Sequence, residues 1–192
     1  MRRKIMVLAL FALAGTLGRD AAQHTALKWN ALYWAVGVPN MSVETRIGER
    51  FTFNADAVYS PWKSIKGRPM LGLQLIPEVR FYPRAAFRGF YVGAYVSYDS
   101  YKVSKWDHPK TDVQHGIGLG IGATLGWQID IARRWGMDFY IGGGWHHGWY
   151  YGVDTRTGER YAPWNRSGEW IPYQAGVTFA YRLGMGRNDK KK

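Results

Sequence analysis

Hydrophobic residues alternate with small or polar ones most regularly between Gly116 and Gly152. From Gly116 to Ile131 nearly every second residue is large and apolar, with glycine, threonine or glutamine between. After a basic break at Arg133 and Arg134, the run from Trp135 to Gly152 repeats the pattern. A period of two is typical of a β-strand with unlike faces. The stretch therefore predicts a β-hairpin with one face in lipid and the other toward a crowded interior.

The same alternation recurs along the chain and gives about eight amphipathic segments. Most are long enough for the roughly 9–11 tilted residues that a membrane-spanning strand needs. Beyond the N-terminal segment, none has a helical period. The predicted strands are Leu27–Val36, Met41–Ile47, Phe51–Tyr59, Leu71–Tyr82, Gly89–Tyr101, Gly116–Ile131, Trp135–Gly152 and Trp170–Leu183.

The connections between these segments alternate in length. They are short after the second, fourth and sixth segments, at Gly48–Arg50, Pro83–Arg88 and Ala132–Arg134. They are long after the third, fifth and seventh, at Ser60–Pro69, Lys102–Gln114 and Val153–Glu169. The first connection, Gly37–Asn40, is short where a long one is expected. Short turns at one end and long loops at the other are typical of outer-membrane barrels. The predicted fold class is all-β, a single antiparallel transmembrane β-barrel of about eight strands.

The N-terminus has the composition of an export signal. Met1–Lys4 is basic and Ile5–Leu17 is apolar and rich in Leu and Ala, which is too short to span a membrane as a helix. A buried N-terminal helix is the alternative interpretation. We expect residues 1–22 to be a signal peptide and residues 23–192 to form one outer-membrane β-barrel domain, located in the bacterial cell outer membrane.

Composition narrows the classes of partner. The chain has 10 Trp, 13 Tyr and 24 Gly, which suits an all-β protein, and no Cys, which excludes a disulfide scaffold and a thiolate metal site. The net charge of +12 is spread over loops and chain ends and makes no helix stripe, so no nucleic-acid partner is expected. The expected partners are outer-membrane lipids and lipopolysaccharide, the barrel-assembly machinery, and an extracellular ligand or surface protein.

Charged residues fall on the inward face of the predicted barrel. An eight-stranded barrel has an interior just wide enough for side chains, and a buried unpaired ion is strongly destabilising. We therefore predict an ion-pair network that fills the lumen. An acid–base site or a narrow ion path is the functional alternative. The network residues are Lys28, Glu44, Arg46, Asp56, Glu78, Arg80 and Arg182.

Catalytic and cofactor patterns are weak. His146 and His147 are adjacent and point to opposite faces, so they are poorly placed to chelate one metal. Ser97 and His146 share the inward face but lie on non-adjacent segments, which disfavours a lipid A deacylase. The glycines of Gly116–Gly126 alternate within a strand and precede no helix, so they are not a phosphate loop. No catalytic residue, cofactor or metal is expected.

Aromatic residues gather near the predicted strand ends, where membrane barrels carry girdles. This group includes Trp29, Tyr82, Trp127 and Trp135. A glycan-binding platform competes with the girdle interpretation near the longest loop. The candidate loop binding surface consists of Trp149, Tyr150, Tyr151 and Trp164.

Four motifs in the first half resemble a known family. They are Lys28, Asn30, Leu32 and Tyr33; Pro39, Asn40 and Glu44; Tyr59, Pro61 and Trp62; and Pro77, Glu78, Arg80 and Tyr82. This pattern resembles the Bacteroidetes-type outer-membrane β-barrel family of unknown function. The resemblance implies an eight-stranded barrel and an outer-membrane location, and it implies no activity. One departure is that the chain continues past Leu183 where many such barrels end at an aromatic residue. An internal assembly signal around Phe179 and Tyr181 is then required.

We therefore expect a small outer-membrane barrel with a filled polar lumen and no enzymatic activity. Its expected role is structural or one of surface interaction through its long extracellular loops. An outer-membrane barrel enzyme acting on lipid A or phospholipid is one alternative. A soluble lipocalin-like carrier is another, in which the apolar residues would face a ligand cavity instead of lipid.

Overall fold

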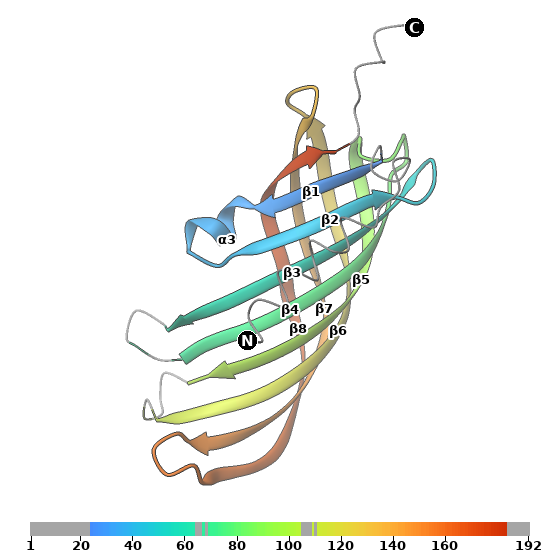
Figure 1. Ribbon diagram of the computed structural model, residues 1–192. Helices are drawn as coiled ribbons and strands as arrows, with labels where there is room; N and C mark the ends of the chain where they lie inside the picture. Colours follow the sequence, from blue (N-terminus) through green and yellow to red (C-terminus); the bar gives the residue numbers. More distant parts are fainter. Residues whose placement is uncertain (1–23, 64–66, 68, 105–108, 110, 184–192) are drawn as a thin grey trace, which may run out of the picture.

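The computed structural model describes residues 24–63, 67, 69–104, 109 and 111–183. The expected signal peptide, residues 1–22, lies outside the described residues. Eight antiparallel strands form a closed barrel in which each strand pairs with its sequence neighbours and β1 pairs with β8 (Figure 1). The predicted all-β barrel of about eight strands is confirmed. The strands are β1 (Thr25–Asn30), β2 (Asn40–Arg46), β3 (Phe51–Lys63), β4 (Pro69–Phe81), β5 (Gly89–Val103), β6 (Asp112–Asp130), β7 (Trp135–Asp154) and β8 (Arg160–Arg182).

The two ends of the barrel differ. The connections at 47–50, 82–88 and 131–134 lie at one end, which we call the turn end. The described chain also begins and finishes there, where the Leu183 N–H donates to the Thr25 carbonyl at 2.9 Å. The C-terminal ends of β3, β5 and β7 and the short helix α3 (Ala31–Ala35) lie toward the opposite end, the loop end (Figure 1).

Helix α3 corrects the predicted first strand. The sequence alternates through Val36, but β1 ends at Asn30, whose side chain accepts a hydrogen bond from the Leu32 N–H at 3.0 Å. Asparagine is a favoured N-cap because its side chain satisfies an otherwise unpaired N–H of the first turn. The connection from β1 to β2 is therefore nine residues, 31–39, instead of the short turn at Gly37–Asn40. The observed connections do not alternate strictly in length: 47–50, 82–88 and 131–134 have 4, 7 and 4 residues, whereas 31–39, 64–68, 104–111 and 155–159 have 9, 5, 8 and 5.

The predicted longest loop is also corrected. Most of Val153–Glu169 is strand, because β7 continues to Asp154 and β8 begins at Arg160. The two strands pair from Val153↔Arg160 inward, with three register shifts, at Gly142/Gly144, Tyr150/Gly152 and Gly152/Val153. The connection itself spans only Thr155–Glu159. The loop between β5 and β6 is likewise shorter than Lys102–Gln114, since β5 ends at Val103 and β6 begins at Asp112.

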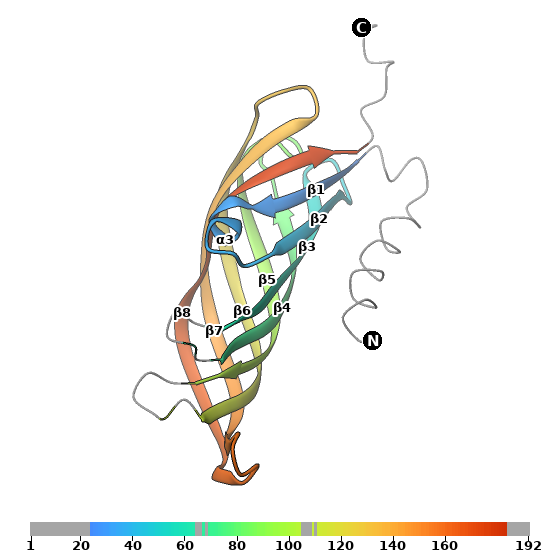
Figure 2. The same cartoon turned by 60° about the vertical axis from the view of Figure 1, so that its left-hand side comes forward.

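Strand length increases around the barrel. β1 has 6 residues and β2 has 7, whereas β6, β7 and β8 have 19, 20 and 23. Figure 2 shows β7 and β8 running well past α3. β1 pairs with β8 only opposite Thr178–Arg182. Within the described part of the chain, residues 160–177 of β8 thus have no strand partner on the β1 side, although α3 packs there.

The alternation of faces is confirmed along the long strands. On β6 the apolar residues face outward and the glycine, threonine and glutamine positions face the lumen. Ile121 and Ile141 are each 63% exposed, whereas Thr124 and Asp138 are fully buried. The interior of this barrel is therefore polar and its outer surface apolar. Among the described residues no helix has the length and apolarity needed to cross a membrane.

Candidate functional site

A network of five buried charged residues crosses the middle of the lumen. Lys28 Nζ lies 2.6 Å from Glu44 Oε2 and 2.5 Å from Asp138 Oδ2. The Arg80 guanidinium lies 2.7 Å from Asp138 and 2.7 Å from Glu78, and 3.4 Å from Glu44. Each of these side chains is at most 3% exposed. The residues come from β1, β2, β4 and β7, so the network ties together strands on opposite sides of the barrel.

The network contains three carboxylates and only two cations. Hydroxyl groups donate further hydrogen bonds to the carboxylate oxygens. Thr52 and Tyr82 donate to Glu44 Oε1 at 2.6 and 2.8 Å, and Tyr91 donates to Asp138 Oδ1 at 2.9 Å. Thr124 donates to Glu78 Oε1. Each carboxylate oxygen of the network thus has at least one donor. Charge-assisted hydrogen bonds of this kind are about twice as strong as neutral ones.

A glycine on β5 leaves room for the Glu78 side chain of β4 to meet the Thr124 side chain of β6. Gly93 on β5 lies between Arg80 on β4 and Thr124 on β6 in the strand register. A Cβ atom there would collide with the Glu78 carboxylate and the Thr124 hydroxyl. On β6, Gly126 similarly leaves room for the ring of Tyr91. The inward glycines therefore accommodate network partners and tyrosine rings.

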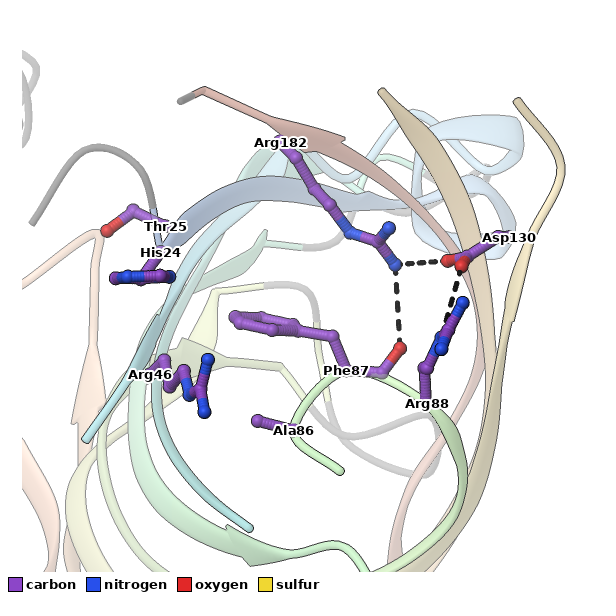
Figure 3. Close-up of a pocket in the computed structure, with 8 residues that line it drawn as sticks. All are labelled: His24, Thr25, Arg46, Ala86, Phe87, Arg88, Asp130 and Arg182. Atoms are coloured by element: carbon purple, nitrogen blue, oxygen red, sulfur yellow. Dashed lines mark hydrogen bonds and ion pairs between the residues drawn. The ribbon is translucent and has the colours of Figure 1, made fainter. Parts of the chain in front are cut away.

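The structure brings together four of the seven predicted network residues, Lys28, Glu44, Glu78 and Arg80. Asp56 lines a narrow space beside them, half-buried, and makes no ion pair within the described part of the chain. Arg46 and Arg182 have the correct inward parity but lie at the turn end. They line a separate pocket there, shown in Figure 3. The prediction is wrong for these two, because parity gives the face of a strand and not the depth in the barrel.

Sequence reasoning missed three central members of the network. Asp138 contacts both cations, and its position between outward-facing Met137 and Phe139 marks it as inward. Tyr91 likewise alternates with outward Phe90 and Val92. Tyr82 was predicted to belong to an aromatic girdle but is fully buried, with its hydroxyl between Glu44 and Gln128.

A second polar group lies nearer the loop end. His146 Nε2 is 2.7 Å from Asp99 Oδ2, and Gln74 Nε2 donates to Asp99 Oδ1 at 2.9 Å. Ser97 and His146 flank Gly120, which pairs with both in the register. Ser97, Asp99 and His146 are all at least 92% buried inside the barrel. Tyr98 and Trp145, which alternate with these residues along β5 and β7, are exposed on the outer surface.

The candidate loop binding surface is divided between two faces of the sheet. Its four residues lie on β7 and β8 and not in the connection between them. Tyr151 and Trp164 are in contact, with ring centroids 4.8 Å apart, and the Arg160 guanidinium lies 4.4 Å from the Tyr151 centroid. Trp149 shares the face of Tyr151 by alternation, whereas Tyr150 lies on the opposite face. Three of the four residues can therefore meet one ligand from outside the barrel.

Metal-site geometry does not emerge from the part of the chain that the structure describes. No group of three or more His, Asp or Glu residues there is arranged to hold a metal ion.

Comparison with curated proteins and with solved structures gives no match. Residues 5–183 match the family described as protein of unknown function (DUF3575). Because that match covers nearly the whole chain, the protein belongs to the DUF3575 family.

Proposed function

We propose that the protein is a small integral outer-membrane β-barrel with a plugged lumen and a structural or surface-interaction role. The observation that carries this proposal is the distribution of polarity, which is the inverse of that in a soluble protein. Exposed apolar residues run along β6 from Ile117 to Ile129, while charged residues fill the interior. Thirteen residues exceed the roughly 9–11 that a tilted strand needs to cross a bilayer.

The alternatives fit this distribution less well. A lipocalin-like carrier would direct its apolar residues into a ligand cavity, but here the lumen contains Lys28, Arg80 and three carboxylates. A passage for ions or solutes would need a water-filled path. The buried network, with Tyr82 and Tyr91 packed at a centroid distance of 5.1 Å, fills that cross-section.

The proposal assigns the two ends of the barrel to two compartments. Short turns of outer-membrane barrels face the periplasm and longer loops face outside. Two of the three connections at the turn end have only four residues, so we assign this end to the periplasm, and the extended part of β6–β8 then projects outward. The outward contact surface would include Trp149, Tyr151 and Trp164. Membrane lipids, lipopolysaccharide and the barrel-assembly machinery are the partners that this placement implies.

Carbonate extraction and heat modifiability test the membrane placement. Membranes of cells that express the full chain are washed with alkaline carbonate, and the pellet is run on a gel with and without boiling. We expect the protein in the pellet and a shift in mobility on boiling, because a folded barrel resists detergent until heated. Release into the supernatant would refute the proposal.

Mass spectrometry of lipid A tests the alternative of a barrel enzyme that acts on lipid A. Lipid A from a deletion strain should show unchanged acyl chains; an altered acyl pattern would favour that enzyme.

A further inference from the structure

A pocket of about 220 Å³ opens at the turn end of the barrel. Its lining comes from the last residues of β2, β6 and β8, the first residues of the described chain, and the connection between β4 and β5. The lining residues are His24, Thr25, Arg46, Ala86, Phe87, Arg88, Asp130 and Arg182 (Figure 3). This turn-end pocket is separate from the central network, which none of its lining residues joins.

The lining is strongly cationic. Three guanidinium groups face one carboxylate, Asp130, an excess of two positive charges before His24 is counted. Asp130 accepts from Arg182 and lies 3.8 Å from Arg88. Arg46 lies across the pocket from this pair (Figure 3). Its Nε donates to the Gly48 carbonyl at 3.0 Å, and it has no carboxylate partner within the described residues.

Phe87, one of the lining residues, helps to position the Arg182 guanidinium. Phe87 is buried against Ala26 and Ala180, and its φ of 68° is a backbone conformation that a bulky residue rarely adopts. Its carbonyl accepts from Arg182 at 3.5 Å. The Arg182 Nε is buried with no hydrogen-bond partner among the described residues. A buried donor without an acceptor is unusual in a folded protein, and an oxyanion supplies such acceptors.

We propose that the turn-end pocket binds a small oxyanion, a phosphate or carboxylate group, between Arg46 on one side and Arg88 and Arg182 on the other. Guanidinium groups present parallel N–H donors that match the paired oxygens of these anions. The volume accepts one such group together with a few further atoms. Binding at this site concerns the end of the barrel and does not depend on where the barrel is located in the cell.

Calorimetric titration of the full-length barrel with inorganic phosphate tests the site. The protein is refolded in a zwitterionic detergent, in buffer free of other polyvalent anions. We expect one saturable site that Arg46→Gln weakens about tenfold or more, since a charged hydrogen bond is lost. Arg50→Gln is the matched control, because Arg50 is exposed in the turn that follows Arg46 and lies outside the pocket. Equal binding by the two variants would refute the site.

The substitution Asp130→Asn should act in the opposite direction. It removes the carboxylate that occupies Arg88 and Arg182, so phosphate should bind several-fold more tightly. Thermal unfolding of each variant confirms that the barrel is intact. Weaker phosphate binding by a folded Asp130→Asn variant would contradict an electrostatic site.

Repeating the titration in lipid nanodiscs distinguishes two sources of the anion. Phosphatidylcholine discs are compared with discs that also contain phosphatidylglycerol. If the anionic lipid prevents phosphate binding, the headgroup is the ligand; if binding is unchanged, the ligand is soluble. Absence of binding in both discs and micelles would overturn the proposal, whatever the result of carbonate extraction.

Discussion

Asp138 holds the two buried cations of the lumen together. One of its oxygens accepts from both Lys28 and Arg80, and the other accepts from Tyr91. Removing one partner of a buried ion pair costs about 3–5 kcal/mol, because the remaining charge loses its compensation in a medium that does not solvate it. Two cations share Asp138, so its loss affects both. Glu44 remains as the other carboxylate within reach of both.

We therefore predict that Asp138→Ala lowers the free energy of unfolding by about 3–5 kcal/mol. Urea unfolding of the refolded barrel in lipid vesicles, followed by tryptophan fluorescence, measures the change. Glu159→Ala is the control, since Glu159 is exposed in the β7–β8 connection, and it should change stability by less than about 0.5 kcal/mol. Equal stability of the two variants would show that the network does not support the fold.

At the scale of secondary-structure elements, the junction of β1, α3 and β2 depends on the side chain of Asn30. Asn30 caps α3 through its Oδ1, and its Nδ2 donates to the Tyr140 hydroxyl at 3.0 Å and to the Ala175 carbonyl at 3.4 Å. Its own N–H donates to Asn40 Oδ1 at 2.9 Å. Gly176 leaves space for this amide. Asn30 thus ends one strand, starts the helix and satisfies a carbonyl on the open side of β8.

We expect Asn30→Ala to destabilise the barrel by about 1–3 kcal/mol, since it leaves buried polar groups without partners. Asn30→Asp retains the cap but loses both Nδ2 donors, so it separates the two contributions. Asn165→Ala, at an exposed position on β8, is the control. The midpoint of the heat-induced gel shift reports each change. A midpoint for Asn30→Ala equal to that of the control would mean that the junction is held by other contacts.

The difference between predicted and observed elements has a physical cause at the same scale. Alternation identified the strands and their inward faces, because a period of two follows from strand geometry alone. It missed α3 because Ala31 and Tyr33 continue the strand pattern. Besides the local cap on the Leu32 N–H, the hydrogen bonds that hold Asn30 come from Asn40 in the next strand and from the distant Tyr140 and Ala175. The sequence pattern did not predict how far Arg46 and Arg182 lie along the barrel axis, because strand tilt and stagger set that position.

Over the whole molecule, the apolar outer surface is the property that the membrane proposal requires. Ile121 lies at the middle of the apolar run on β6, and Ile129 lies beside the turn end. In a bilayer, an arginine on the lipid face costs about 2–4 kcal/mol at the midplane and about 0–1 near the interface. In water, neither position would penalise a charge.

The substitutions Ile121→Arg and Ile129→Arg should therefore differ. We predict that Ile121→Arg reduces the folded fraction after refolding into phosphatidylcholine vesicles, whereas Ile129→Arg changes it little. The unboiled gel band measures the folded fraction. Equal and high folded fractions for both variants would indicate that this face does not contact lipid.

The unequal strand lengths, which leave residues 160–177 of β8 without a described strand partner on the β1 side, also affect how neighbouring molecules can pair through their strands. An open strand edge offers unpaired N–H and C=O groups to a strand of another chain. Two of the three register shifts between β7 and β8, those opposite Gly143 and Tyr151, coincide with Pro172 and Pro163, which have no N–H to donate. Proline in sheets is confined to edges and bulges, and bulges interrupt a regular ladder. β8, which extends beyond β1, therefore contains prolines and bulges that oppose pairing with a strand of another molecule. Its long unpaired edge can project from the barrel without joining copies of the protein into a continuous sheet.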